Sequence, residues 1–186
     1  MYDLAYEGLG RAYFKKKEFA LAEPNFRKAI SLNHRLWLSY NFLGNIYDQR
    51  QEFDQAILEY TSAIALQPDQ GFLYNNLGVS CRLAGRDQAA LDALAKAIAK
   101  GYRESRVYNN LAMAYADMGR FDDAFEALRK AGGEAHAYNN MGCIYLEHGR
   151  YPEAVRSFEK AIALEPGYYS KAADNLKTAR MLAAKQ

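Results

Sequence analysis

A short phrase recurs along the chain at a nearly constant spacing. It reads Tyr-Glu-Gly-Leu-Gly at 6–10, Tyr-Asn-Phe-Leu-Gly at 40–44 and Tyr-Asn-Asn-Leu-Gly at 74–78. It then returns as Tyr-Asn-Asn-Leu-Ala at 108–112 and Tyr-Asn-Asn-Met-Gly at 138–142, so that three intervals of 34 residues precede one of 30. A 34-residue period is typical of helix–turn–helix arrays, in which neighbouring units bury each other's apolar faces. We therefore expect five units, at 3–36, 37–70, 71–104, 105–134 and 135–168.

Positions inside a unit, numbered from its first residue, predict two helices. Positions 4, 7, 8 and 11 share one face of a first helix, and positions 20, 24 and 27 share one face of a second helix. Residues at positions 8, 20 and 27 are small, which allows the two backbones to approach closely. Gly85, Gly119 and Gly149 follow the first helix at position 15, where glycine supplies a left-handed cap. The pattern predicts an all-α fold.

Together these positions resemble the tetratricopeptide repeat (TPR) family. Position 4 is tyrosine and positions 20 and 27 are alanine in all five units, while the proline expected at position 32 is present as Pro68 and Pro166. The resemblance implies a right-handed solenoid whose first helices line a concave groove. Most tyrosines then serve packing, which leaves Tyr2, Tyr102, Tyr168 and Tyr169 as those that could contribute to recognition.

Two parts of the chain depart from the repeat. The fourth unit ends at Gly132-Gly133-Glu134 with four residues fewer, so its second helix should stop about one turn early. This shortening is either a tolerated deletion or a local change of superhelical pitch. Residues 169–186 predict a C-terminal capping helix with a polar outer face. The first repeat has no comparable cap, which suggests a chain cut from something longer.

Composition narrows the possible functions. A formal charge of +2 removes the electrostatic argument for nucleic acid or an anionic membrane as the main partner. No apolar run is long enough to insert into a membrane, and the N-terminus lacks a signal peptide, so the location is unknown and cytoplasmic by default. Two cysteines and three scattered histidines form no disulfide framework and no metal site. No catalytic or cofactor motif is present, and we expect a protein that is not an enzyme.

Asparagines occupy two positions that, by resemblance, face the groove. Position 5 holds Asn41, Asn75, Asn109 and Asn139, and position 6 holds Asn76, Asn110 and Asn140. A carboxamide offers a donor and an acceptor together, so such a column can pair with the backbone of an extended peptide. The position-6 column resembles the asparagine ladder in the TPR superhelix of O-linked N-acetylglucosamine transferases. The alternative is that these residues are plain TPR consensus.

Position 9 adds an apolar stripe at the same groove. It holds Val79, Met113 and Cys143 in consecutive units, which favours contact with a peptide or an amphipathic helix. The alternative is that the stripe packs against the capping helix or a closed superhelix.

Charged residues at the groove positions argue against one well-known TPR function. Chaperone-tail binding uses a clamp of cations and asparagines around two carboxylates. At the matching positions this chain has Asn41, Asn45, Asn76, Arg106 and Asn110. Two of the three cations are therefore absent, and a doubly charged carboxylate would lose most of its charge-assisted bonds. Arg82, with Arg106, remains a candidate peptide contact.

These observations favour a scaffold or adaptor that binds a peptide or helix of another protein in the concave groove. A second interpretation is a self-assembly module that uses its convex faces or its uncapped N-terminal edge. A third is a regulatory segment of a larger enzyme, or of a secretion or pilus assembly system. The sequence leaves these three readings open.

Overall fold

The computed structural model describes residues 2–165 and 170–185, and within those ranges it is built from α-helices without strands. The helices are α1 (Tyr2–Lys15), α2 (Phe19–Leu32), α3 (Trp37–Gln49), α4 (Phe53–Leu66), α5 (Gly71–Leu83), α6 (Asp87–Ala99), α7 (Ser105–Asp117), α8 (Phe121–Glu147), α9 (Tyr151–Leu164) and α10 (Ser170–Ala183). The predicted all-α class is confirmed. Although the sequence shows no linker, internal contacts divide the chain into two compact units, Met1–Tyr102 and Arg103–Gln186.

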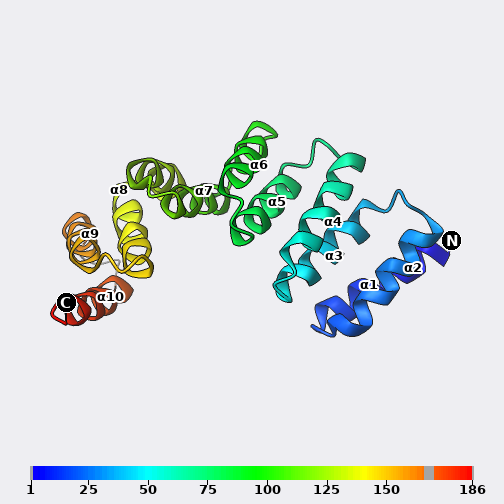
Figure 1. Cartoon of the computed structure of the whole chain (residues 1–186), viewed down its shortest axis with the longest axis horizontal. Coiled ribbons are helices and arrows are strands. Elements are labelled where there is room, and N and C mark those ends of the chain that lie inside the picture. Colours follow the sequence, from blue (N-terminus) through cyan, green and yellow to red (C-terminus); the bar gives the residue numbers. More distant parts are fainter. Residues whose placement is uncertain (1, 166–169, 186) are drawn as a thin grey trace. The chain divides into compact units, whose positions relative to one another are not determined.

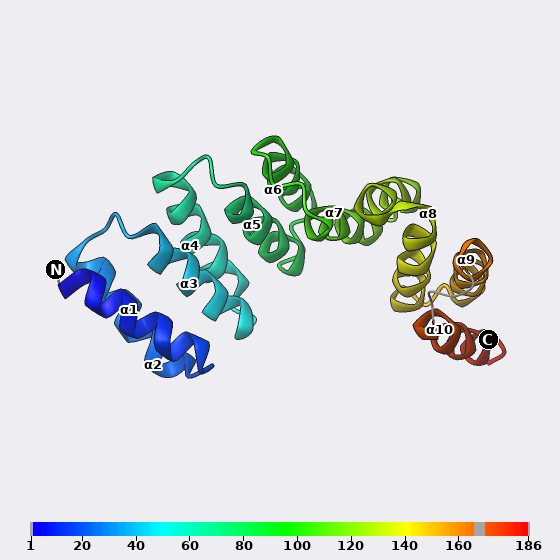
Figure 2. The ribbon, with the colours of Figure 1, turned by 180° about the vertical axis from the view of Figure 1, so that it is seen from behind.

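The first unit consists of three helix pairs, α1 with α2, α3 with α4, and α5 with α6. The two helices of each pair lie side by side and run in opposite directions (Figures 1 and 2). Phe26, Tyr60 and Leu94, all at position 24 of their repeats, are among the largest fully buried side chains. The core of the unit therefore lies between the paired helices, as the position-24 pattern predicts.

Close helix packing depends on the glycine at position 8. A Cβ atom built on Gly10 would lie 2.8 Å from the Phe26 ring, and one on Gly44 would lie 2.7 Å from the Tyr60 ring. In the second unit, Gly142 stands in the same relation to Phe158, at 2.5 Å. Ordinary carbon contacts need about 3.5–4.0 Å. Each ring at position 24 therefore packs directly on the bare backbone of its partner helix.

Position 15 adopts a left-handed backbone in every repeat. The φ angles are 71° at Gly85, 75° at Gly119 and 69° at Gly149, which confirms the predicted glycine caps. Lys17 and Gln51 take the same conformation, each with φ of 61°. The turn geometry is thus set by the repeat, and two non-glycine residues adopt it at a steric cost.

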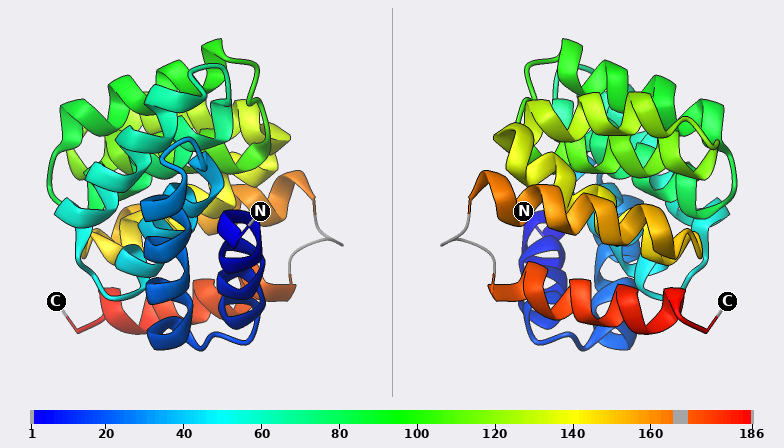
Figure 3. Two further views of the ribbon diagram at one scale, coloured as in Figure 1. Left: turned by 90° about the vertical axis from the view of Figure 1, so that its right-hand side faces the viewer. Right: turned by 90° about the vertical axis from the view of Figure 1, so that its left-hand side faces the viewer.

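The second unit contains α7 to α10. Helix α8 breaks at Gly132 and Gly133, so that 121–131 forms the second helix of repeat 4 and 134–147 forms the first helix of repeat 5. The second helix of repeat 4 therefore stops early, and Gly133, with φ of 85°, has a backbone conformation that favours glycine. Helix α10 lies beside α9 (Figure 3), with Ala172 and Ala179 buried. Pro166, Tyr168 and Tyr169 lie outside the described residues.

Candidate functional site

In the first unit, the asparagines at positions 5 and 6 differ in exposure. Asn41 and Asn75, at position 5, expose 8% and 2% of their surface, whereas Asn76 at position 6 is half-buried. The Asn76 Nδ2 donates to the Asn41 Oδ1 at 3.1 Å, which joins α5 to α3. Position 5 thus serves contact between repeats, and position 6 is the more accessible asparagine.

Two further polar contacts connect the first helices of this unit. The Ser39 Oγ donates to the buried Glu7 carboxylate at 2.7 Å, between α3 and α1. The Ser80 Oγ donates to Asp48 at 2.6 Å, between α5 and α3, and Tyr60 donates to the other Asp48 oxygen at 2.8 Å. Burial raises the pKa of the Asp48 carboxyl, against the lowering effect of these two hydrogen bonds. Glu7 and Asp48 are therefore bonded inside the protein.

The remaining candidates of the first unit flank Asn76. Asn45 is half-buried and donates its Nδ2 to the Asn41 carbonyl at 2.7 Å, one turn back on α3. Val79 and Arg82 are half-buried on α5, and Leu83 beside them exposes 44% of its surface. An apolar contact area thus adjoins a partly accessible carboxamide on α5.

In the second unit, the asparagines gather around a histidine. The Asn140 Nδ2 lies 2.9 Å from the His136 Nε2 and 3.5 Å from the Asn109 Oδ1, and the Asn139 Nδ2 donates to the Asn140 Oδ1 at 3.0 Å. Burial lowers the pKa of His136, so the ring is neutral near pH 7 and can accept at Nε2. The Asn139 Oδ1 is buried without a hydrogen-bond partner. Asn109, Asn110, Asn139 and Asn140 are all half-buried.

The apolar stripe of position 9 ends differently in this unit. Met113 is half-buried on α7, and Arg106 is exposed near the start of the same helix. Cys143 is half-buried in a cluster with Leu146 and Leu176, and Asn175 of α10 donates to its Sγ at 3.7 Å. Helix α10 therefore contacts the stripe at Cys143.

Sequence reasoning did not anticipate that these side chains bond to each other. Ser39, Ser80 and His136 supply contacts on the first-helix face that no motif singled out. One sequence signal for such a contact was available. Ser39 is a polar residue at position 3 of the second repeat, where the third and fourth repeats have Leu73 and Val107. The face is therefore pre-organised by its own hydrogen bonds.

Reactive chemistry has little support on this face. Cys81 is buried, and burial raises the pKa of its thiol, which lowers the fraction of reactive thiolate. Across 2–165 and 170–185, histidine, cysteine and carboxylate side chains do not gather in groups of three that could hold a metal ion. Within the same residues, none of the helices combines the length and apolar character needed to cross a membrane.

Comparisons with solved structures identify proteins of the same fold. The crystal structure of MamA matches with a TM-score of 0.75 and 27% identity, over 90% of this chain and 95% of that chain. YrrB, described as a TPR protein with an unusual peptide-binding site, matches with a TM-score of 0.70 and 21% identity, over 93% and 90%. PilW, described as a type IV pilus biogenesis factor, matches with a TM-score of 0.73 and 18% identity, over 100% and 92%. No curated protein matches the chain.

Family comparison covers most of the sequence. Four models described as tetratricopeptide repeat match residues 4–34, 42–102, 106–131 and 135–168. These segments contain the recurring phrase, the position-8 glycines and the paired helices described above. The chain therefore belongs to the tetratricopeptide repeat family.

Proposed function

We propose that the first-helix faces of this chain bind extended peptide segments of partner proteins. TPR proteins are protein-interaction scaffolds, and this chain is one of them. The finer proposal is that Asn76 on α5 hydrogen-bonds the backbone of a peptide segment bound at the first unit. In the second unit, Asn110 on α7 and Asn140 on α8 hydrogen-bond the backbone of a segment bound there. The half-buried state of these three carboxamides is the observation that carries it.

The hydrogen-bonding capacity of Asn76 supports a role in backbone recognition. A carboxamide has two N–H donors and two acceptor lone pairs. One N–H of Asn76 goes to Asn41, and its Oδ1 accepts from Asn75 in a long contact of 3.5 Å. One donor and one acceptor therefore remain, which matches what a single peptide unit offers. Because the side chain is already held in place, binding costs less conformational entropy.

Apolar neighbours give the peptide side chains a surface to cover. On α5, Val79 and Leu83 lie within two turns of Asn76, and on α7 Met113 lies three residues after Asn110. Arg106 adds an exposed cation on α7. A peptide with alternating apolar side chains would fit α5, and one that also carries an acidic residue would fit α7.

Peptides selected from a displayed random library against the wild-type protein test the proposal. Their affinities are then measured by fluorescence polarisation for the variant Asn76→Ala/Asn110→Ala/Asn140→Ala. Each lost hydrogen bond should cost about 0.5–1.5 kcal/mol. Binding should therefore weaken at least about twofold for a peptide at the first unit, which loses one bond, and at least about fivefold for a peptide at the second unit, which loses two. Asn25→Ala is the matched control, since Asn25 lies on the second helix α2 and bonds only the Leu21 carbonyl in its own helix.

Unchanged affinity in the triple variant would refute the role of the asparagines. Circular dichroism melting of both variants separates this result from partial unfolding, because Asn140 also contacts His136 and Asn109. A loss of affinity at equal melting temperature supports the proposal. An equal loss in Asn25→Ala would show that the effect is not specific to the face.

A second candidate function is self-association through α1. Tyr2 and Leu9, seven residues apart and therefore on one face of this helix, expose 80% and 45% of their surface, so the helix presents apolar area that pairing could bury. Sedimentation velocity over a range of concentrations tests it, with Tyr2→Gln/Leu9→Gln as the variant. A wild-type protein that stays monomeric at high concentration contradicts this candidate.

A further inference from the structure

A crevice opens in the second unit on a different side from the asparagines. It has a volume of about 410 Å³ and lies between the second helix of repeat 4, the first helix of repeat 5 and α9. The residues that define this B-helix crevice are Phe121, Asp122, Phe125, Glu126, Tyr138, Met141, Tyr145, Glu153, Arg156, Ser157 and Lys160. Tyr138, Met141 and Tyr145 occupy positions 4, 7 and 11, so they share one face of α8 that excludes Asn140 and Cys143.

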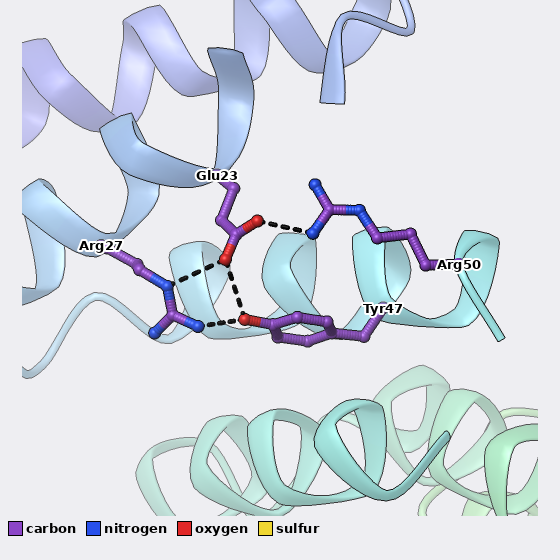
Figure 4. A network of polar contacts seen from close by, with 4 residues as sticks. All are labelled: Glu23, Arg27, Tyr47 and Arg50. Atoms are coloured by element: carbon purple, nitrogen blue, oxygen red, sulfur yellow. Dashed lines mark hydrogen bonds and ion pairs between the residues drawn. The ribbon is translucent and has the colours of Figure 1, made fainter. Parts of the chain in front are cut away.

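Repeats 1 and 2 hold an ionic network at the corresponding positions. The Glu23 carboxylate of α2 contacts Arg27 at 3.0 Å, Tyr47 of α3 at 3.0 Å and Arg50 at 2.7 Å (Figure 4). Arg27 also donates to the Tyr47 hydroxyl. Burial raises the pKa of Glu23, but the hydrogen bonds from Arg50, Arg27 and Tyr47 outweigh it, so the pKa is lowered overall. This junction is closed by charged side chains.

Repeats 4 and 5 keep only half of that network. Arg129 and Tyr145 occupy the positions of Arg27 and Tyr47, but Phe125 replaces the acid and His148 replaces Arg50. Ser157 replaces Glu59, so the side of the crevice formed by α9 also loses side-chain volume. At the place where repeats 1 and 2 have the Glu23 carboxylate, the junction between repeats 4 and 5 therefore has the aromatic ring of Phe125.

Aromatic rings form the floor of the B-helix crevice. Phe125 and Tyr138 have their ring centroids 4.8 Å apart, and Phe121 and Tyr145 have theirs 5.1 Å apart. Both pairs are tilted. Arg150 lies over the Phe121 and Tyr145 rings, and the Lys160 Nζ lies over the Tyr138 ring at 4.9 Å, so an inserted ring has to pack beside these cations or displace the exposed Lys160. An apolar cavity of about 150 Å³ already binds benzene. The volume of the crevice therefore suffices for an aromatic side chain together with adjoining backbone.

Charges of opposite sign flank this floor. Asp122 and Glu126 lie one turn apart on α8, and Arg156 and Lys160 lie one turn apart on α9. All four residues are exposed. Glu126 pairs with Arg129 at 2.7 Å, an exposed ion pair weak enough for a ligand to exchange. Glu153 also lines the α9 side, but it pairs with Arg150 at 2.6 Å. The crevice is therefore complementary to an apolar group with a positive charge on one side and a negative charge on the other.

We propose that the B-helix crevice is a second peptide-binding site. Its occupant is a segment of a partner protein that inserts one aromatic side chain between Phe125, Tyr138 and Tyr145. A basic residue of the segment faces Asp122 and Glu126, and an acidic residue faces Arg156 and Lys160. This site is separate from the first-helix face, so one chain can hold two peptide segments at once.

A displayed library of random linear peptides tests this second site. Clones selected on the wild-type protein are counter-selected on Phe125→Glu/His148→Arg, which copies the closed network of repeats 1 and 2. We expect enrichment of peptides with one aromatic residue between a basic and an acidic residue. Their affinity should fall at least about tenfold in the double variant, the loss expected for removing one buried aromatic anchor. Lys130→Glu, an exposed change on α8 outside the crevice, should leave the affinity unchanged.

Charge-swap variants provide a second test in case Phe125→Glu/His148→Arg has a lowered melting temperature. Lys160→Glu changes an exposed residue, and it should weaken the selected peptides. Exchanging the acidic residue of the peptide for lysine should then restore the affinity. Absence of this rescue overturns the proposal, as does a selection without the basic–aromatic–acidic pattern. Peptides whose binding is lost only in Asn76→Ala/Asn110→Ala/Asn140→Ala belong to the first-helix face. A selection that yields only such peptides also overturns the proposal of a second site.

Discussion

Gly8 and Gly10 lie two residues apart in α1 but have different surroundings. A Cβ atom on Gly8 would meet nothing within 4 Å. A Cβ atom on Gly10 would lie 2.8 Å from the Cε1 and 2.9 Å from the Cδ1 of Phe26, whose side chain is fully buried. The same substitution to alanine at these two positions therefore isolates the effect of close helix packing.

The expected free energies have opposite signs. Alanine stabilises a helix interior by roughly 0.5–1 kcal/mol relative to glycine, and Gly8→Ala should show this gain alone. Gly10→Ala has the same gain, but an added methyl group in a packed core costs about 1–3 kcal/mol. The difference between the two variants, about 1–3 kcal/mol, measures the contact between position 8 and position 24.

Urea unfolding followed by the fluorescence of Trp37 measures this difference, since the only tryptophan lies at the start of α3 in the same unit. Gly10→Ala/Phe26→Leu is the matched rescue, because repeat 4 pairs Ala112 with Leu128 at these two positions. The double variant should be more stable than the sum of its single changes predicts. Equal stability of Gly8→Ala and Gly10→Ala would refute the packing argument.

Two further changes test the turns and the asparagine cluster. Gln51→Gly should stabilise the protein by about 0.5–1 kcal/mol. It removes the left-handed strain at φ of 61°, and part of that gain is lost because glycine makes the unfolded chain more flexible. Thermal melting measures the effect, and a lower melting temperature would contradict this prediction. His136→Gln should flatten the fall in stability below pH 6.5. Burial lowers the folded-state pKa of His136, so the wild type loses stability as the pH drops from the unfolded pKa of 6.5 through the folded pKa. Urea midpoints at pH 7 and pH 5 for both proteins measure this, and identical pH slopes would contradict it.

Local patterns predict the frame of the fold well. The 3.6-residue periodicity places Gly10 against Phe26, and Gly85 at its turn has the expected left-handed conformation. These features depend on one helix pair, which the repeat spacing determines. The partners of polar side chains depend on the distance between different repeats, so the bond between Asn76 and Asn41 was not predictable.

The B-helix crevice could not be predicted from the sequence for a related reason. Phe125 and Ser157 line it where repeats 1 and 2 have Glu23 and Glu59, and each of these residues is ordinary by itself. A sequence pattern reports which side chains are present. Open volume depends on which neighbouring side chains fail to fill the same space.

The hydrogen bonds between successive first helices bear on how the first unit unfolds. In a linear repeat array each repeat contacts only its neighbours, so terminal repeats can fray independently unless the interfaces are strong. Loss of the first repeat would leave Ser39 without Glu7, and loss of the third would leave Asp48 without Ser80 and Asn41 without Asn76. Each of these hydrogen bonds would be exchanged for one to water, at a net cost of about 0.5–1.5 kcal/mol, or about 1.5–3 kcal/mol where a carboxylate accepts. Fraying from either side is thereby penalised, and the three repeats should open as one cooperative block whose amide protons exchange together.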